Sequence, residues 1–160
     1  TTIFRFFTVY GPWGRPDMAL FTFTKNILEN NPIEIYNRGN MYRDFTYVED
    51  LVKSILLLID KSPESGKKVS QRDSLSNVAP YRIVNIGSSK QIKLIDFVNA
   101  LEKELGMTAE KDFLDMQKGD VLATESDSSL LMDLTGFRPA TSLEDGIKEF
   151  VNWYKWYYKC

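Results

Sequence analysis

The fold class of this 160-residue chain is indicated first by the run Ile3-Phe4-Arg5-Phe6-Phe7-Thr8-Val9-Tyr10-Gly11-Pro12-Trp13-Gly14-Arg15-Pro16. The first part of the run is rich in β-branched and aromatic residues, which predicts a strand over Ile3–Val9. The second part holds two glycines and two prolines, which predicts a stiff loop. The composition over Asp17–Asn30 is helical, and the Asn-Asn-Pro sequence at 30–32 ends that helix.

Strand and helix patterns alternate through the rest of the chain. Further extended segments are predicted at Ile33–Tyr36, Arg43–Val48, Arg82–Ile86 and Asp112–Met116. Apolar residues on one helical face predict helices that start near Val48 and near Leu94, the second of them closed by Gly106. A short helix is predicted over Ser128–Leu134, and a last helix after a capping box at Thr141-Ser142-Leu143-Glu144. The alternation predicts an α/β fold with some parallel pairing, in one region over residues 1–160, with a surface loop at Lys61–Pro80.

Composition excludes several classes of function. The formal net charge is −2, so the chain is not an obvious nucleic-acid binder. There is no histidine, which excludes a Ser-His nucleophile and a histidine-bound zinc from this chain. No apolar run approaches the roughly 20 residues that cross a membrane. Cys160 is the single cysteine, which favours a reducing compartment, and we therefore expect a cytoplasmic protein.

The loop after the first strand is a candidate ligand site. Gly11 and Gly14 let the backbone approach a ligand closely, and the prolines stiffen the turn. Arg15 then presents a planar set of donors that suits a carboxylate or a phosphate. A rigid turn with a solvated arginine is the alternative explanation.

Two further segments carry residue types that bind nucleotides. An aromatic side chain at the end of a strand, Tyr36, precedes Arg43, and such a pair can stack a base and neutralise a phosphate. Asp120, in the polar loop that begins at Gln117, has a carboxylate suited to ribose hydroxyls. The alternatives are an edge tyrosine with a surface arginine, and a solvated turn.

Two patterns of nicotinamide enzymes are absent. A dinucleotide site needs a glycine-rich turn between a strand and a helix, but the Gly11–Gly14 segment lacks a third glycine and leads into Pro16. No tyrosine has a lysine four residues later, so the Tyr-x-x-x-Lys pair of proton transfer is missing too. The residues of this chain therefore offer no evident general acid or base and no nicotinamide cradle.

Several of these motifs together resemble one family. They include Arg5–Ala19, Arg43-Asp44-Phe45-Thr46-Tyr47, Tyr81–Gly87 and Met116-Gln117-Lys118-Gly119-Asp120-Val121. The pattern is similar to the extended short-chain dehydrogenase/reductases, and within them to the UDP-glucuronate 4-epimerases of bacterial capsule and surface-polysaccharide synthesis. The resemblance covers essentially the whole chain.

The resemblance implies that the chain is the C-terminal, substrate-binding half of an NAD-dependent epimerase and includes the last strands of the Rossmann sheet. It implies that NAD is bound mainly by an N-terminal Rossmann region absent from this chain, which also holds the Tyr-x-x-x-Lys pair. The chain alone is then expected to be inactive. The family reaction moves hydride from sugar C4 to NAD and returns it to the other face of a 4-keto intermediate, which converts UDP-glucuronate to UDP-galacturonate. A homodimer is implied for the full-length enzyme.

The resemblance also assigns roles at the sugar end of the site. Thr8 matches a family position near the sugar ring, at the end of a Rossmann strand. Arg15 matches the arginine that pairs with the hexuronate carboxylate. This pairing is physically reasonable, because a fixed carboxylate discourages decarboxylation of the β-keto intermediate.

At the nucleotide end, Tyr36 matches the aromatic residue that stacks on uracil, and Arg43 matches the arginine that binds the diphosphate. Gln117 and Asp120 match the loop that meets the uridine ribose. Gln117 stands where other epimerases of the superfamily carry arginine.

Three alternatives to a UDP-glucuronate 4-epimerase stay open at this point. A UDP-hexose or UDP-N-acetylhexosamine 4-epimerase, or a UDP-glucuronate decarboxylase, would share most of these motifs. A stand-alone module that binds UDP-sugars without catalysis is the second. An inert truncation product is the third.

Overall fold

The predicted parallel pairing is present three times in the computed structural model, which describes residues 1–160. The parallel pairs are β1 (Thr2–Phe6) with β5 (Arg82–Ile86), β2 (Thr8–Tyr10) with β4 (Tyr42–Tyr47), and β3 (Ile33–Ile35) with β7 (Lys111–Phe113). A seventh strand, β6 (Gln91–Lys93), joins β4 antiparallel, so the central sheet has the order β2-β4-β6. The expected mixed α/β class is thus confirmed, but with three small sheets in place of one large sheet.

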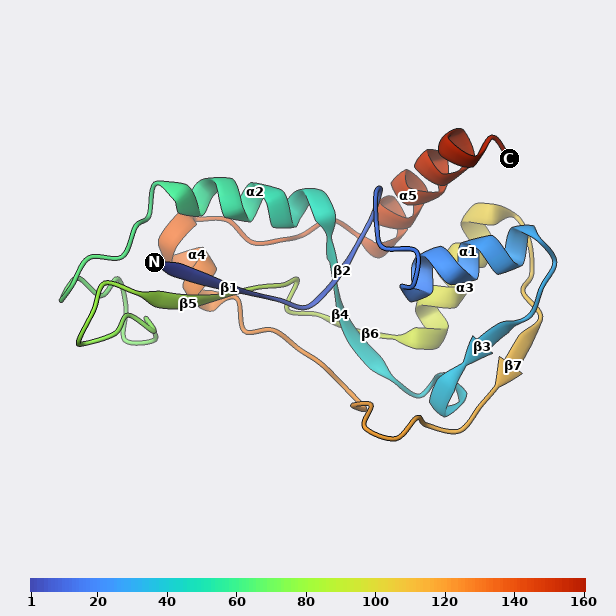
Figure 1. The fold of residues 1–160 in the computed structure, drawn as a ribbon, viewed down its shortest axis with the longest axis horizontal. Coiled ribbons are helices and arrows are strands. Elements are labelled where there is room, and N and C mark those ends of the chain that lie inside the picture. The colour runs from blue at the N-terminus through green and yellow to red at the C-terminus, as the bar shows by residue number, and fades with distance from the viewer.

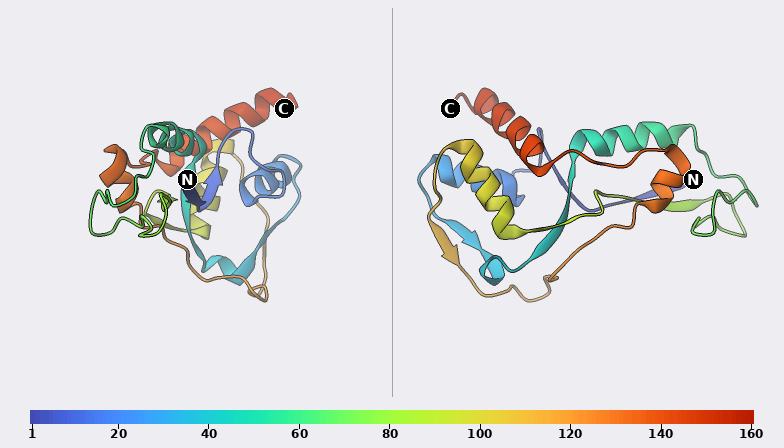
Figure 2. Two further views of the ribbon diagram at one scale, coloured as in Figure 1. Left: turned by 60° about the vertical axis from the view of Figure 1, so that its left-hand side comes forward. Right: turned by 180° about the vertical axis from the view of Figure 1, so that it is seen from behind.

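The helices pack at the two ends of an elongated molecule (Figure 1). They are α1 (Ala19–Leu28), α2 (Val48–Ile59), α3 (Leu94–Leu105), α4 (Ser129–Thr135) and α5 (Leu143–Tyr158). Helices α1, α3 and α5 enclose a large apolar core, whereas α2 and α4 pack with β5 around a smaller one. Figure 2 shows from behind how β4 runs from the large core to the start of α2. None of the helices is long and apolar enough to cross a membrane.

The strand predicted over Ile3–Val9 is wrong as a single element. The chain leaves one sheet at Phe7, so that β1 pairs with β5 and β2 pairs with β4. The residue types of a segment indicate whether it suits a strand, but they do not indicate which strand it pairs with. Here the pairing partner changes within one β-rich segment. The short strand β6 was also missed. The one-turn helix η1 (Tyr36–Gly39) begins at the residue that was predicted to end a strand.

The predicted helix boundaries hold well, with one correction at the last helix. Gly106 ends α3 in the left-handed conformation, with φ 68°, as predicted. The cap of α5 is Ser142, whose hydroxyl accepts the backbone N–H of Asp145 at 3.1 Å, and not Thr141. The reason is tertiary, because the backbone N–H of Thr141 donates to the Asp50 carboxylate of α2 at 2.9 Å. The loop between α2 and β5 is irregular as predicted, and a buried ion pair between Asp73 and Arg82 holds it.

A buried carboxylate joins the two ends of the molecule. Asp44 of β4 is fully buried. It accepts hydrogen bonds from the backbone N–H groups of Ser88, Ser89 and Ser126 at 2.9–3.0 Å, and from the hydroxyls of Ser88 and Ser126 at 2.8 and 2.5 Å. These partners lie after β5 and before α4, so one side chain fixes β4 to both segments. A sixth, longer contact comes from the nearby Thr46 hydroxyl at 3.4 Å. Because the other five donors lie more than 40 positions away in sequence, their bonds form only when the chain has folded.

Replacement of this carboxylate is therefore expected to be costly. Asp44→Ala removes the shared acceptor of these buried and part-buried donors, and we expect the free energy of unfolding to fall by about 3 kcal/mol or more. Equilibrium urea denaturation measures this loss. The matched control is Asp115→Ala at an exposed position, for which we expect a change within about 0.5 kcal/mol. Equal stability of the two variants would show that the Asp44 network does not hold the fold.

The contact between β2 and α5 depends on a helix glycine. Gly146 of α5 faces the buried ring of Tyr10, and a Cβ at this position would lie 2.7 Å from two ring carbons. The Tyr10 hydroxyl donates to the backbone carbonyl of Ser142 at 3.3 Å, and burial raises the pKa of that hydroxyl. The glycine lets the end of β2 approach the helix closely.

Alanine at this position should destabilise the protein, although alanine is the better helix former. Gly146→Ala inserts a methyl group into the Tyr10 ring, and overpacking of this kind costs about 1–3 kcal/mol. The thermal midpoint of unfolding should fall. In Asn152→Ala, at an exposed position of the same helix, the midpoint should stay the same or rise, because alanine suits a helix better than asparagine. A rise for Gly146→Ala would contradict the packing described here.

Candidate functional site

A cleft of about 500 Å³ opens beside the central sheet. It is lined from β2 by Thr8, from the start of η1 by Tyr36, from β4 by Arg43, and from the loop before α4 by Asp120. Helices α1 and α3 supply apolar wall residues. Four of the six candidate residues from the sequence therefore share one cavity, although they are up to 112 positions apart.

Arg43 is the fixed cation of this cleft. Its guanidinium donates to Asp120 Oδ1 at 2.8 Å and to the backbone carbonyl of Tyr42 at 2.9 Å. The side chain is only 17% exposed, so the ion pair is partly shielded from water. A guanidinium has five N–H groups, and the protein does not use all of them. Arg43 can therefore hold an anionic ligand while Asp120 fixes its position.

Tyr36 is oriented by a neighbouring carboxylate. Its hydroxyl donates to Glu34 Oε2 at 2.8 Å, and this hydrogen bond is the main cause of the raised pKa of Tyr36. Gln117 does not line the cleft, but its side chain lies close enough to the Tyr36 hydroxyl to oppose that shift. The ring is thus held at the cleft wall by a polar contact at its far end.

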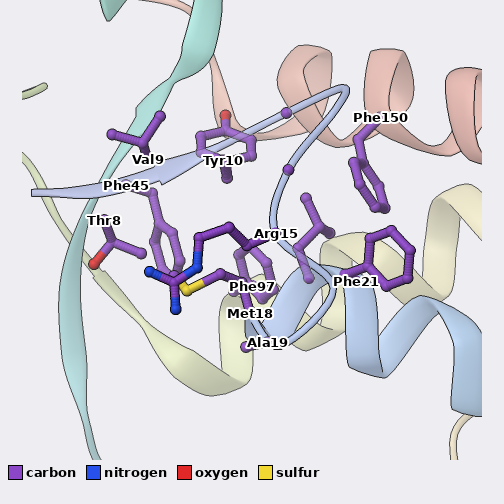
Figure 3. A pocket seen from close by; sticks show the side chains of 13 residues that line it. Thr8, Val9, Tyr10, Arg15, Met18, Ala19, Phe21, Phe45, Phe97 and Phe150 are labelled. Carbon is purple, nitrogen blue, oxygen red and sulfur yellow. The ribbon is translucent and has the colours of Figure 1, made fainter.

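Arg15 lies next to the cleft and not in its wall. Together with Thr8 it lines a smaller adjoining pocket, and Figure 3 shows the guanidinium and the Thr8 hydroxyl on the same side of that pocket. Arg15 is exposed and bound to Asp17, with 3.1 Å between Nε and Oδ1. This hydrogen bond lowers the pKa of Asp17 and raises that of Arg15. Thr8 and Phe45 line both cavities, so Arg15 stands at one end of a continuous recess.

Three carboxylates in the cleft wall were missed by the sequence analysis: Asp17, Glu34 and Asp112. A signal existed for Glu34, which lies two residues before Tyr36 and thus on the same side of an extended segment. Asp112 is the register partner of Glu34 across β3 and β7, and that pairing is known only from the fold. The cleft therefore combines one shielded arginine with several acceptors for hydroxyl and N–H groups.

The segment after β2 does not have the geometry of a glycine-rich dinucleotide cradle. After β2, Gly11 and Gly14 belong to a turn that reaches α1 only at Ala19, so no backbone N–H groups converge at a helix start directly after the strand. No group of three or more His, Cys, Asp or Glu side chains is arranged to hold a metal ion.

Known proteins that are similar to this chain include UDP-glucuronate 4-epimerases. A probable UDP-glucuronate 4-epimerase of Rhizobium meliloti is 49% identical over 99% of this chain and 48% of its own length. Protein CapI of Staphylococcus aureus is 48% identical over 99% of this chain and 48% of its own length. The crystal structure of UDP-glucuronic acid 4-epimerase from Bacillus cereus, with UDP-glucuronic acid and NAD, is 34% identical with a TM-score of 0.81. It is matched by 98% of this chain over 46% of its own length.

The chain thus spans about half the length of each of these proteins. It has the fold of the C-terminal part of the Bacillus cereus epimerase, which confirms the expected fold class and the expected resemblance. Residues 1–87 also match the family model described as the NAD dependent epimerase/dehydratase family. This match covers more than half of the chain. On these grounds the chain belongs to the NAD-dependent epimerase/dehydratase family.

Proposed function

We propose that this chain forms the nucleotide-sugar-binding part of an NAD-dependent UDP-glucuronate 4-epimerase. The observation that carries the proposal is the single cleft shared by Thr8, Tyr36, Arg43 and Asp120, which four separate segments contribute. The similarity to a Bacillus cereus epimerase solved with UDP-glucuronic acid and NAD supports the same substrate class. The reaction is the interconversion of UDP-glucuronate and UDP-galacturonate.

In the proposed complex, the nucleotide lies along the cleft from Tyr36 to Arg43. The uracil ring stacks on Tyr36, and the diphosphate binds the free donors of Arg43. Both contacts of Asp120 fall on Oδ1, to Arg43 and to the backbone N–H of Val121, so Oδ2 stays available to a ribose hydroxyl. In the proposal, Gln117 of the same loop also contacts the ribose.

The sugar lies at the other end, beside Thr8 and Arg15. A hexuronate carboxylate binds Arg15, which requires the arginine to share or exchange its present partner Asp17. Binding to Arg15 then disfavours decarboxylation of the sugar while its C4 is a ketone. This role separates an epimerase of uronates from a decarboxylase of the same substrate.

The redox step belongs to NAD, which accepts hydride from a sugar carbon and returns it when bound. The turn after β2 in this chain does not match the glycine-rich cradle for that cofactor. What this chain contributes in the proposal is binding and orientation of the nucleotide sugar.

The diphosphate role of Arg43 can be tested by titration of the chain with UDP. Arg43→Ala removes charge-assisted hydrogen bonds, and we expect binding to weaken by about 1.5–3 kcal/mol, roughly 10- to 150-fold. Isothermal titration calorimetry measures the change. Arg5→Ala is the matched control, because Arg5 lies on β1, is exposed and binds Asn85. An affinity for UDP that is the same in both variants would remove Arg43 from the site.

The uronate assignment depends on a difference between two sugars. Arg15→Ala should weaken binding of UDP-glucuronate by about 10-fold or more and leave UDP-glucose almost unchanged, because only the first sugar carries a carboxylate. Competition titrations with the two ligands give the ratio directly. Losses of equal size for both ligands would contradict a carboxylate at Arg15 and would favour a UDP-hexose as the substrate.

A further inference from the structure

The turn before Arg15 contains Trp13 at a position whose backbone conformation is unfavourable for tryptophan. The backbone N–H of Gly14 donates to the carbonyl of Gly11 at 3.2 Å, with Pro12 and Trp13 between them. Trp13 has a φ of 62°. A turn with proline second and a positive φ third is of type II, and its third position normally holds glycine or asparagine. A bulky tryptophan there is strained, and such strain persists only where the surroundings impose it.

The surroundings that hold Trp13 are aromatic side chains of α5. Its ring lies 5.3 Å from that of Trp153 and 5.4 Å from that of Tyr157. These two rings, one helical turn apart, stack on each other at 5.5 Å. Since Trp13 itself is 69% exposed, burial of its own surface does not account for its position. The contact is instead a specific attachment of the turn to the helix.

Helix α5 is a rigid anchor for this attachment. Its inner face, Ile147, Phe150 and Val151, is at most 1% exposed and belongs to the large core. In Figure 3, Phe150 enters the pocket wall from α5 opposite the strand that carries Thr8. The contact of Trp13 with α5 therefore links the turn to the large core.

Arg15 follows Trp13 by two residues and has few restraints of its own. Its backbone carbonyl accepts the N–H of Met18 at 3.1 Å, and its guanidinium is hydrogen-bonded to Asp17, which is also exposed. The side chain of Arg15 is 75% exposed. Its place beside Thr8 thus depends on the path of the turn more than on contacts of the guanidinium.

We propose that Trp13 is a positioning residue for sugar specificity. Its contact with Trp153 and Tyr157 holds the turn so that Arg15 faces the sugar end of the cleft. The proposal rests on the function proposed above, in which Arg15 binds the hexuronate carboxylate. Glycine at position 13 would form the turn without strain, but it has no side chain that could contact α5. The backbone strain at Trp13 is then the cost of that contact.

Replacement of Trp13 by glycine separates this role from stability. Glycine adopts the positive φ without strain, so Trp13→Gly should keep or raise the thermal midpoint of unfolding. Its affinity for UDP-glucuronate should fall about tenfold, while its affinity for UDP-glucose stays within about twofold. Trp13→Phe keeps an aromatic ring against α5 and should retain most of the preference for the uronate. Trp156→Phe, on the same helix, is the matched control and should retain all of it, because the exposed Trp156 ring pairs with Tyr157 and phenylalanine keeps an aromatic ring at that place.

The outcomes distinguish the two proposals. If Arg15→Ala abolishes the preference for UDP-glucuronate and Trp13→Gly leaves it intact, Trp13 has no positioning role and the inference fails alone. If Arg15→Ala leaves the preference intact, or the unsubstituted chain binds no UDP-glucuronate, the proposed function fails and this inference with it.

Discussion

The carboxylate of Asp44 is the constraint on which the rest of the structure depends. It accepts from three backbone N–H groups and two hydroxyls in segments that come together only in the folded chain. The strand that carries it runs between the two apolar cores, so the network fixes how those cores lie relative to each other. A buried charge is tolerated here because directed donors surround it on both oxygens.

The same strand places the functional side chains. Side chains alternate along β4, so Arg43 and Phe45 share the side opposite to Asp44 and both line the cleft. Phe45 also stacks on Phe97 of α3, at 4.5 Å between rings, and is a register partner of Thr8 in β2. Three consecutive residues thus provide a cleft-lining cation, the buried carboxylate network and a core contact. Any slip of this strand would exchange the faces and lose all three.

The charge of the cleft explains how it can discriminate between anions. One shielded arginine faces several carboxylates, so the cleft does not attract anions in general. An anionic ligand gains affinity there only where its phosphate or carboxylate meets Arg43 or Arg15 with good geometry. Precise placement of the two arginines therefore matters more than their number. Asp120 positions Arg43 through an ion pair, and in our proposal the attachment of the turn to α5 positions Arg15.

The sequence by itself determined the class of the fold, most helix boundaries and the residue types of the site. Periodicity and capping depend on neighbours a few positions apart, which is why the ends of α2 and α3 were predictable. Tertiary structure alone decided that one β-rich run divides between two sheets and that Ser142 caps α5. It also brought Glu34 and Asp112 together, and it placed Arg15 beside the cleft and not in its wall. These features depend on partners far along the chain, and the energy of such pairings is not encoded in any local pattern.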